Sequence, residues 1–158
     1  MRILKIFISV LLLIILFACG KKTVPTTAAY TSHEIECLGT DPSGAQRLRV
    51  WGEGKDAKAA QESARKKAVE AVLFGHITAG SGQCNSWPVI DNPTTRRTQH
   101  EYFAKFFKDG GKFKKFIKAE KAREEKRFTG NDKVVQELEV TVDREGLLKQ
   151  MTKDKIIR

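Results

Sequence analysis

The chain has 158 residues, which leaves room for a single domain, and its 29 Lys and Arg outnumber its 19 Asp and Glu to give a formal charge of +10. This charge favours anionic partners such as phospholipid head groups, acidic glycans, nucleic acid or acidic proteins, and does not choose among them. At 41% hydrophobic residues the chain can bury a core, although part of this content lies in an apolar N-terminal run.

The N-terminus has the pattern of an export signal. A basic start, Met1–Lys5, precedes the apolar run Ile6–Ala18, which is interrupted only by Ser9. This run is shorter than the roughly twenty residues that a helix needs to cross a bilayer. It matches the apolar region of a secretory signal, which has roughly 7–15 residues. We therefore expect residues 1–18 to be a signal peptide.

The run ends in Leu16-Phe17-Ala18-Cys19, which resembles a bacterial lipobox: an aliphatic residue, then a small residue directly before cysteine. The resemblance implies cleavage before Cys19 and lipid on its thiol, and two or three acyl chains would hold the protein firmly in a membrane. A short membrane anchor or a buried first helix is the alternative. The residue after the cysteine is Gly20. An Asp at this position would indicate retention in the inner membrane. We therefore expect an outer-membrane lipoprotein of the bacterial envelope that faces the periplasm.

Residues 19–32 are expected to be the lipidated cysteine and a tether, because Thr23–Ser32 is small, polar and without apolar periodicity. The folded domain is therefore expected over residues 33–158.

Cys37 and Cys84 are the two remaining cysteines. Outside the inner membrane thiols are oxidised, so we expect a disulfide between them, with two separate buried thiols as the alternative. No Cys-x-x-Cys is present, and His33, His76 and His100 have no ligand spacing with the cysteines. The sequence therefore predicts neither a metal site nor a cofactor.

The first half of the domain predicts a hairpin followed by a helix. Glu34–Leu38 and Arg47–Gly54 flank a turn-rich segment, and the second strand alternates, with Leu48 and Val50 on one side and Arg47, Arg49 and Trp51 on the other. Asp56 is a capping residue for a helix that ends at Phe74, before Gly75. Its apolar stripe contains Ala57, Ala60, Ala64, Ala68, Val69, Ala71, Val72 and Leu73.

The second half begins with a long irregular segment, Thr78–Pro93, of the kind that is functional or disordered. Thr95–Lys108 predicts a helix whose apolar side contains Tyr102, Phe103, Phe106 and Phe107.

Lys112–Phe128 is ambiguous, because its residue types favour a helix whereas the following turn, Thr129–Asp132, and strand, Val134–Val142, favour a hairpin. We predict strand-turn-strand, with two helices as the alternative. A short helix, Arg144–Met151, follows the cap Asp143, with Leu147, Leu148 and Met151 facing inward. The predicted fold is α+β: a small antiparallel sheet of two hairpins with about three helices packed on one face.

The order of these elements resembles a known family. A strand ending in Gly-x-Gly (Arg49–Gly54) is followed by an alanine-rich helix with an AxxxARxxAxxA pattern, and a late strand leads into a leucine-bearing helix (Glu137–Met151). This order is similar to that of membrane-associated lipoproteins of the twenty-kilodalton type and to the N-terminal domain of flagellar assembly protein T. The likeness covers Arg47–Met151, with Thr78–Pro93 as an insertion-like loop. It implies an envelope-associated assembly or structural role, with no catalytic residues to carry over.

No pattern in the sequence predicts catalysis. Gly52-Glu53-Gly54 lacks the rest of a phosphate-binding motif, so a tight turn from strand to helix is the better interpretation. A nucleophilic cysteine with His76 or His100 is disfavoured by the expected disulfide. A hydrolase set from Ser81, Asp91 and His100 has no supporting motif.

The segment Phe103–Lys118 interleaves lysines with five phenylalanines. The lysines of this predicted face are Lys105, Lys108, Lys112, Lys114, Lys115 and Lys118. Such interleaving can serve nucleic acid, which the export signal disfavours. Two interpretations remain open: the phenylalanines belong to the core and the lysines to a solvated face, or the lysines dock on an anionic head group, cell-wall polymer or acidic protein.

The sequence thus favours a non-catalytic, lipid-anchored envelope protein that binds or scaffolds another envelope component. The alternative is a periplasmic ligand-binding module that uses residues 78–93, with Trp87 in its site. A deep pocket around Trp87 would favour the alternative, and a flat basic face would favour docking. The oligomeric state is not determined by the sequence.

Overall fold

The computed structural model describes residues 35–80, 82–128 and 133–158, with the side chains of residues 124–128 excepted. The predicted signal peptide, lipidated Cys19, tether and Thr129–Asp132 turn lie outside these residues, as do His33 and Ser81. Within the described ranges, no helix combines the length and apolar character needed to cross a membrane.

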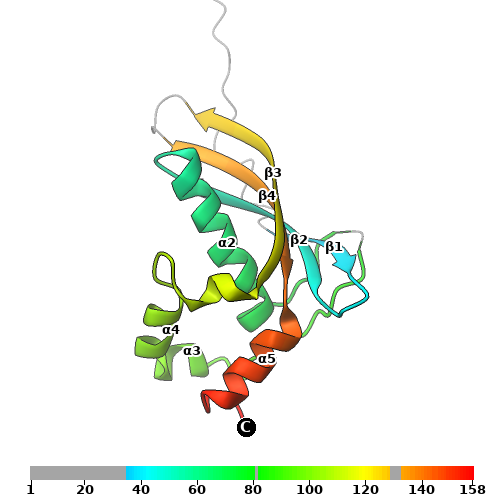
Figure 1. The fold of residues 1–158 in the computed structure, drawn as a ribbon, viewed down its shortest axis with the longest axis vertical. Coiled ribbons are helices and arrows are strands. Elements are labelled where there is room, and N and C mark those ends of the chain that lie inside the picture. The colour runs from blue at the N-terminus through cyan, green and yellow to red at the C-terminus, as the bar shows by residue number, and fades with distance from the viewer. Residues whose placement is uncertain (1–34, 81, 129–132) are drawn as a thin grey trace, which may run out of the picture.

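The strands form one antiparallel sheet in the order β1-β2-β4-β3 (Figure 1). Their bounds are β1 (Ile35–Thr40), β2 (Gln46–Gly54), β3 (Ile117–Phe128) and β4 (Lys133–Val142). The predicted antiparallel sheet is confirmed: β1 pairs with β2, β3 pairs with β4, and the pairing of β2 with β4 joins the two pairs. The ambiguous segment is a strand from Ile117, whereas its first residues, Lys112–Phe116, form a 3₁₀ helix, η2.

The two faces of the sheet follow the predicted alternation. Leu48 and Val50 on β2 lie opposite Val140 and Leu138 on β4, and all four are buried on the inner face. On the outer face Arg49 lies between two acidic neighbours, 2.9 Å from Glu36 and 3.1 Å from Glu137. Charged cross-strand contacts therefore lie on the side of the sheet that faces away from the core.

Helix α2 (Ala57–Phe74) crosses the inner face of the sheet (Figure 1). Asp56 caps it, accepting a hydrogen bond of 2.8 Å from the Ala59 amide, and the helix ends at Gly75 as predicted. Its predicted apolar stripe is buried except for Ala57, which is half-buried. Farther along the helix, Arg65 donates to both carboxylate oxygens of Glu120 on β3, at 2.7 and 2.6 Å.

The glycines of the Gly-Glu-Gly motif explain why α2 has alanines on its inner side. Gly52 and Gly54 are the final glycines of β2, and a Cβ at Gly52 would overlap the Ala60 carbonyl oxygen. A Cβ at Gly54 would overlap the Ala60 amide nitrogen. The motif therefore allows backbone-to-backbone contact between strand and helix, a role beyond the tight turn that we expected.

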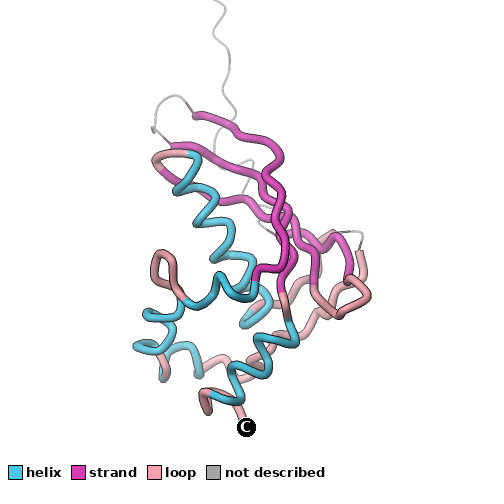
Figure 2. The backbone as a smooth tube through the Cα atoms, viewed as in Figure 1, coloured by secondary structure: helices cyan, strands magenta, loops and turns pink. Residues whose placement is uncertain are grey.

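The remaining helices gather at one end of the sheet (Figures 1 and 2). They are α3 (Thr95–Thr98), α4 (His100–Phe106) and α5 (Arg144–Lys153), with η2 between α4 and β3. The prediction of helices packed on one face of the sheet therefore holds for α2, whereas the other three lie beyond the end of the sheet.

Two helix predictions are corrected. The single helix expected over Thr95–Lys108 is interrupted at Gln99, whose φ and ψ of −107° and 30° are not helical, and it ends at Phe106. The threonines near this break have low helix propensity, which favours it. Leu148, expected to face inward, is exposed, because it is turned about 100° around α5 from the buried Leu147.

Candidate functional site

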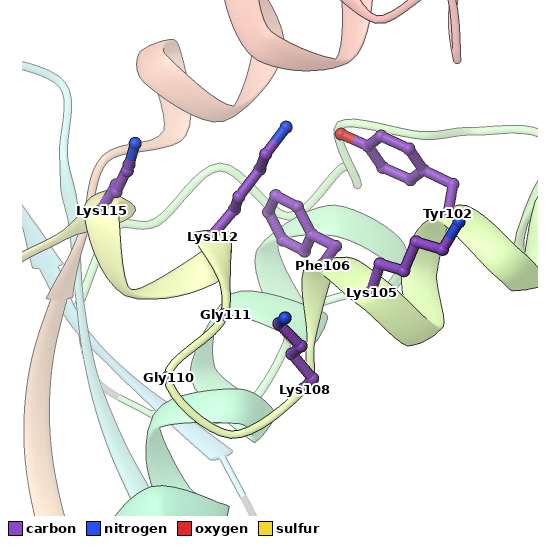
Figure 3. Close-up of a pocket in the computed structure, with 8 residues that line it drawn as sticks. All are labelled: Tyr102, Lys105, Phe106, Lys108, Gly110, Gly111, Lys112 and Lys115. Atoms are coloured by element: carbon purple, nitrogen blue, oxygen red, sulfur yellow. The ribbon is translucent and has the colours of Figure 1, made fainter.

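Four of the six predicted lysines line one cleft between α4, η2 and the loop that joins them (Figure 3). The cleft, with a volume of about 420 Å³, is called the lysine cleft here. Its lining residues are Tyr102, Lys105, Phe106, Lys108, Gly110, Gly111, Lys112 and Lys115. Lys114 and Lys118 do not line it, so the structure divides the predicted face into two groups.

The division follows from the geometry of η2. Residues three apart lie on one side of a 3₁₀ helix, so Lys112 and Lys115 share a side and Phe113 and Phe116 share another. The two phenylalanines are buried, whereas the two lysines are exposed and rise together into the cleft (Figure 3). Lys114 occupies the third side and points to α2. The 3₁₀ period therefore sorts neighbouring lysines into different environments.

Phe106 supplies the apolar wall of the lysine cleft. Its ring lies between the side chains of Lys112 and Tyr102 (Figure 3) and is stacked against the Tyr102 ring at 5.9 Å. Only 1% of Phe106 is exposed, and Phe103 is also buried. The interpretation that the phenylalanines form core is thus confirmed for these residues, and the lysines stand over a fixed apolar base.

Two ion pairs hold the loop between α4 and η2 against α2. Lys114 Nζ lies 2.8 Å from Glu62, and Lys66 Nζ lies 2.6 Å from Asp109. The Gly110 amide also donates to Glu62, at 3.4 Å. Burial raises the pKa of Glu62, but its bonds to Lys114 and Gly110 lower it more, and the net pKa lies below the usual range. Lys114 therefore helps to hold the loop that frames the cleft in place.

The other side of the lysine cleft is held by a bond between helices. The Tyr102 hydroxyl donates to Asp154, just past the end of α5, at 2.6 Å. Burial, and then this bond, raises the pKa of Tyr102 above its ordinary value of 10.0. The same bond, helped by the charge of Lys112, lowers the pKa of Asp154. Tyr102 is thus a neutral donor at physiological pH.

Positive charge predominates in the lysine cleft. No carboxylate lines it, and none of its four lysines forms a hydrogen bond or an ion pair with another described residue. Lys118, by contrast, donates to the Ser43 hydroxyl at 3.0 Å and lies 3.7 Å from Asp143. Lys114 and Lys118 therefore form bonds within the fold, whereas the four lysines of the cleft remain able to bind a ligand.

The loop that carries Trp87 is fastened to the sheet by covalent and hydrogen bonds. The Sγ atoms of Cys37 and Cys84 lie 2.08 Å apart, the distance of a disulfide, in agreement with the predicted pairing. Beyond it, the buried Gln46 side chain donates to the Asn85 carbonyl at 3.0 Å, and the Trp87 amide donates to the Asn85 side chain at 3.0 Å. The loop is held on both sides of Trp87 because the next segment, Val89–Ile90, bonds to the last turn of α2.

Trp87 stands on the rim of an open groove. It is 69% exposed, and its ring meets His76 edge-on at 5.5 Å. Leu148 of α5 is the other exposed large hydrophobic residue among those described, and it lines the same groove. The groove, of about 810 Å³, is lined by Trp87, Pro88, Val89, Ile90, Asp91, Asn92, Thr95, Leu148, Ile156, Ile157 and Arg158. Trp87 therefore borders a broad surface depression and is not enclosed in a deep pocket.

Several residues that shape these sites had no signal in the sequence. Glu62 and Lys114, or Tyr102 and Asp154, are about fifty positions apart, and no short motif links them. In the part of the chain that the structure describes, no group of three His, Cys, Asp or Glu side chains converges as metal ligands would. The described residues therefore present ammonium groups, aromatic rings and an apolar groove to a ligand.

No protein-family model, curated protein or solved structure matches this chain, so its function is argued from the lysine cleft and the Trp87 loop alone.

Proposed function

We propose that this chain is a non-catalytic, lipid-anchored protein of the bacterial envelope that binds an anionic envelope component in the lysine cleft. The observation that carries the proposal is the group of four lysines over the apolar base of Phe106, none of which forms an ion pair with another residue that the structure describes. Such lysines repel one another, and an anion between them would relieve this repulsion.

The frame of the cleft supports a binding role over a solvated face. Two other lysines, Lys66 and Lys114, fix the loop through Asp109 and Glu62, and the four cleft lysines extend from this fixed frame. A site whose backbone is ordered before binding loses less entropy when a partner arrives.

The envelope location rests on the export signal, the lipobox-like Cys19 and the cysteine pair. Disulfides persist in oxidising compartments such as the periplasm, and the Cys37–Cys84 pair agrees with such a location. In this proposal the lipid keeps the domain at the membrane, and the lysine cleft selects the partner.

Cross-linking in intact cells tests the proposal. A variant with Lys105, Lys108, Lys112 and Lys115 changed to Glu should lose the envelope component that cross-links to and co-purifies with the parent protein. The matched control changes four other exposed lysines, Lys55, Lys58, Lys149 and Lys153, to Glu, which alters the net charge equally. The proposal fails if both variants retain the component or if both lose it equally.

The rigid presentation of Trp87 favours a second candidate function, a periplasmic ligand-binding module. An exposed tryptophan on a fastened loop leaves apolar surface in water unless a ligand covers it, and Trp is frequent at binding hot spots. Native mass spectrometry of protein from cells should then show a bound small molecule that Trp87→Ala loses and Trp51→Phe retains. Absence of a bound molecule from the parent protein would reject this function.

A further inference from the structure

We infer that the ligand of the lysine cleft carries a terminal phosphate group, a phosphomonoester or diphosphate, attached to an apolar or ring-shaped carrier. This inference rests on the proposed function and specifies its ligand. Its first basis is charge: among the described residues, the charged groups that line the cleft are four lysines, with no arginine and no carboxylate.

The type of cation favours phosphate over carboxylate. Arginine binds a planar carboxylate through two parallel hydrogen bonds, whereas lysine is a compact point charge with three rotatable donors on a flexible stem. Lysines that line several sides of one cleft can turn their flexible side chains toward a tetrahedral group with more than one negative charge. A phosphomonoester near pH 7 carries between one and two negative charges and three acceptor oxygens, and a single carboxylate would leave more of the lysine charge uncompensated.

The carrier is inferred from size and surface. A volume of about 420 Å³ falls in the range of small-molecule sites and exceeds what a bare phosphate ion fills. The half-buried Tyr102 presents ring surface beside the lysines (Figure 3), the buried Phe106 ring is stacked against it, and the Tyr102 hydroxyl already donates to Asp154. The non-phosphate part of the ligand therefore meets aromatic carbon and no free hydrogen-bonding group of Tyr102.

The compact arrangement separates this ligand from a polymer. Lys105, Lys108, Lys112 and Lys115 line one cleft formed by α4, η2 and the loop between them, whereas a strand of nucleic acid or an anionic glycan chain needs charges spread along a groove. The two sources that share the required chemistry are a membrane lipid with a terminal phosphate and a soluble phosphate ester.

Lysine footprinting on the full chain in a non-ionic detergent tests the inference. The probes are phenyl phosphate, inorganic phosphate and benzoate, and the readout is protection of each lysine from acetylation, measured by mass spectrometry. Phenyl phosphate should protect the four cleft lysines saturably and leave Lys66 and Lys114 unchanged, with benzoate and inorganic phosphate weaker. Equal protection by benzoate, or no saturable protection by phenyl phosphate, overturns the inference.

Two further measurements make the test specific. Lys112→Glu with Lys115→Glu should weaken phenyl phosphate binding about tenfold or more, because charge-assisted hydrogen bonds are lost, whereas Lys55→Glu with Lys58→Glu should not. Lowering the pH from about 7.5 to about 5 should weaken phenyl phosphate binding but not benzoate binding, since a phosphate monoester loses its second charge near pH 6. A reversed or absent pH effect contradicts the phosphate assignment.

Vesicles separate the two sources. Vesicles of phosphatidic acid in phosphatidylcholine should protect the cleft lysines if the ligand is a lipid, and vesicles of phosphatidylglycerol at equal charge should protect them less. Protection by phenyl phosphate without protection by phosphatidic acid supports the soluble source and the same chemistry. Failure of every phosphate probe, together with loss of the cross-linked component in the four-lysine variant, rejects this inference and leaves the proposed function standing.

Discussion

Lys114 on η2 and Glu62 on α2 form an ion pair of 2.8 Å that spans about fifty residues of sequence and separates Lys114 from its neighbours Lys112 and Lys115. Three lysines within four positions thereby have two different roles. One fastens the loop that frames the lysine cleft, and the other two extend into the cleft.

This division predicts different effects of two neighbouring substitutions. Lys114→Glu should lower the free energy of unfolding by about 1 kcal/mol, because it replaces an ion pair with repulsion at Glu62. Lys115→Glu should change stability by less than about 0.5 kcal/mol and act on ligand binding. Urea unfolding followed by circular dichroism measures both. Equal destabilisation by the two variants would show that Lys114 has no special structural role.

Gly52 should not tolerate a side chain. Because a Cβ there overlaps the Ala60 carbonyl, Gly52→Ala should force α2 away from β2 and cost about 1–3 kcal/mol. The adjacent Glu53→Ala is the control, since Glu53 points to the other face, and its effect should be below about 0.5 kcal/mol. If Gly52→Ala unfolds at the parent urea concentration, the close packing is not essential.

Tyr102 should titrate abnormally. A folded pKa above the ordinary 10.0 means that its contribution to stability is fully present below pH 10.0 and is lost as pH rises through the folded value. Absorbance at 295 nm should therefore show a tyrosine step above the ordinary range, which Tyr102→Phe removes. The other tyrosine of the chain is Tyr30, and the control Tyr30→Phe should leave the raised step in place.

Loss of the Cys37–Cys84 bond should loosen the Trp87 loop. Replacing both cysteines with Ala should lower stability by about 2–5 kcal/mol and move the Trp87 fluorescence. Reduction of the parent protein should reproduce both changes, whereas reduction of the double variant should do nothing further. The comparison uses Trp51→Phe as background, so that Trp87 is the emitting residue. An unchanged spectrum on reduction would mean that hydrogen bonds alone hold the loop.

Cys19 is predicted to carry the lipid. Cys19→Ala should abolish labelling by a radioactive fatty acid and release the protein from the membrane fraction. Cys84→Ala, which removes a different cysteine, should leave labelling intact. Continued labelling of Cys19→Ala would overturn the lipobox interpretation and the membrane attachment with it.

Local patterns predicted most of the secondary structure because they act over a few residues. The alternation of Leu48 and Val50 with charged neighbours identified β2, and the capping carboxylates Asp56 and Asp143 marked the starts of α2 and α5. Where two local signals conflicted, over Lys112–Phe128, the pairing of the following strand decided in favour of β3. The sequence did not predict the break at Gln99 or the 3₁₀ helix η2, because both depend on how distant segments of the chain pack together.

By itself, the sequence determined the α+β class, the alanine-rich helix and the segment that holds the candidate site, and it favoured the two hairpins and the cysteine pairing over their alternatives. Only the tertiary structure decided which lysines of that segment are available, because Glu62 and Asp143, at positions distant in sequence, pair with Lys114 and Lys118. It also decided that Trp87 and Leu148 share a groove. Periodicity reports the side of an element on which a residue lies, whereas a binding surface depends on which elements come together.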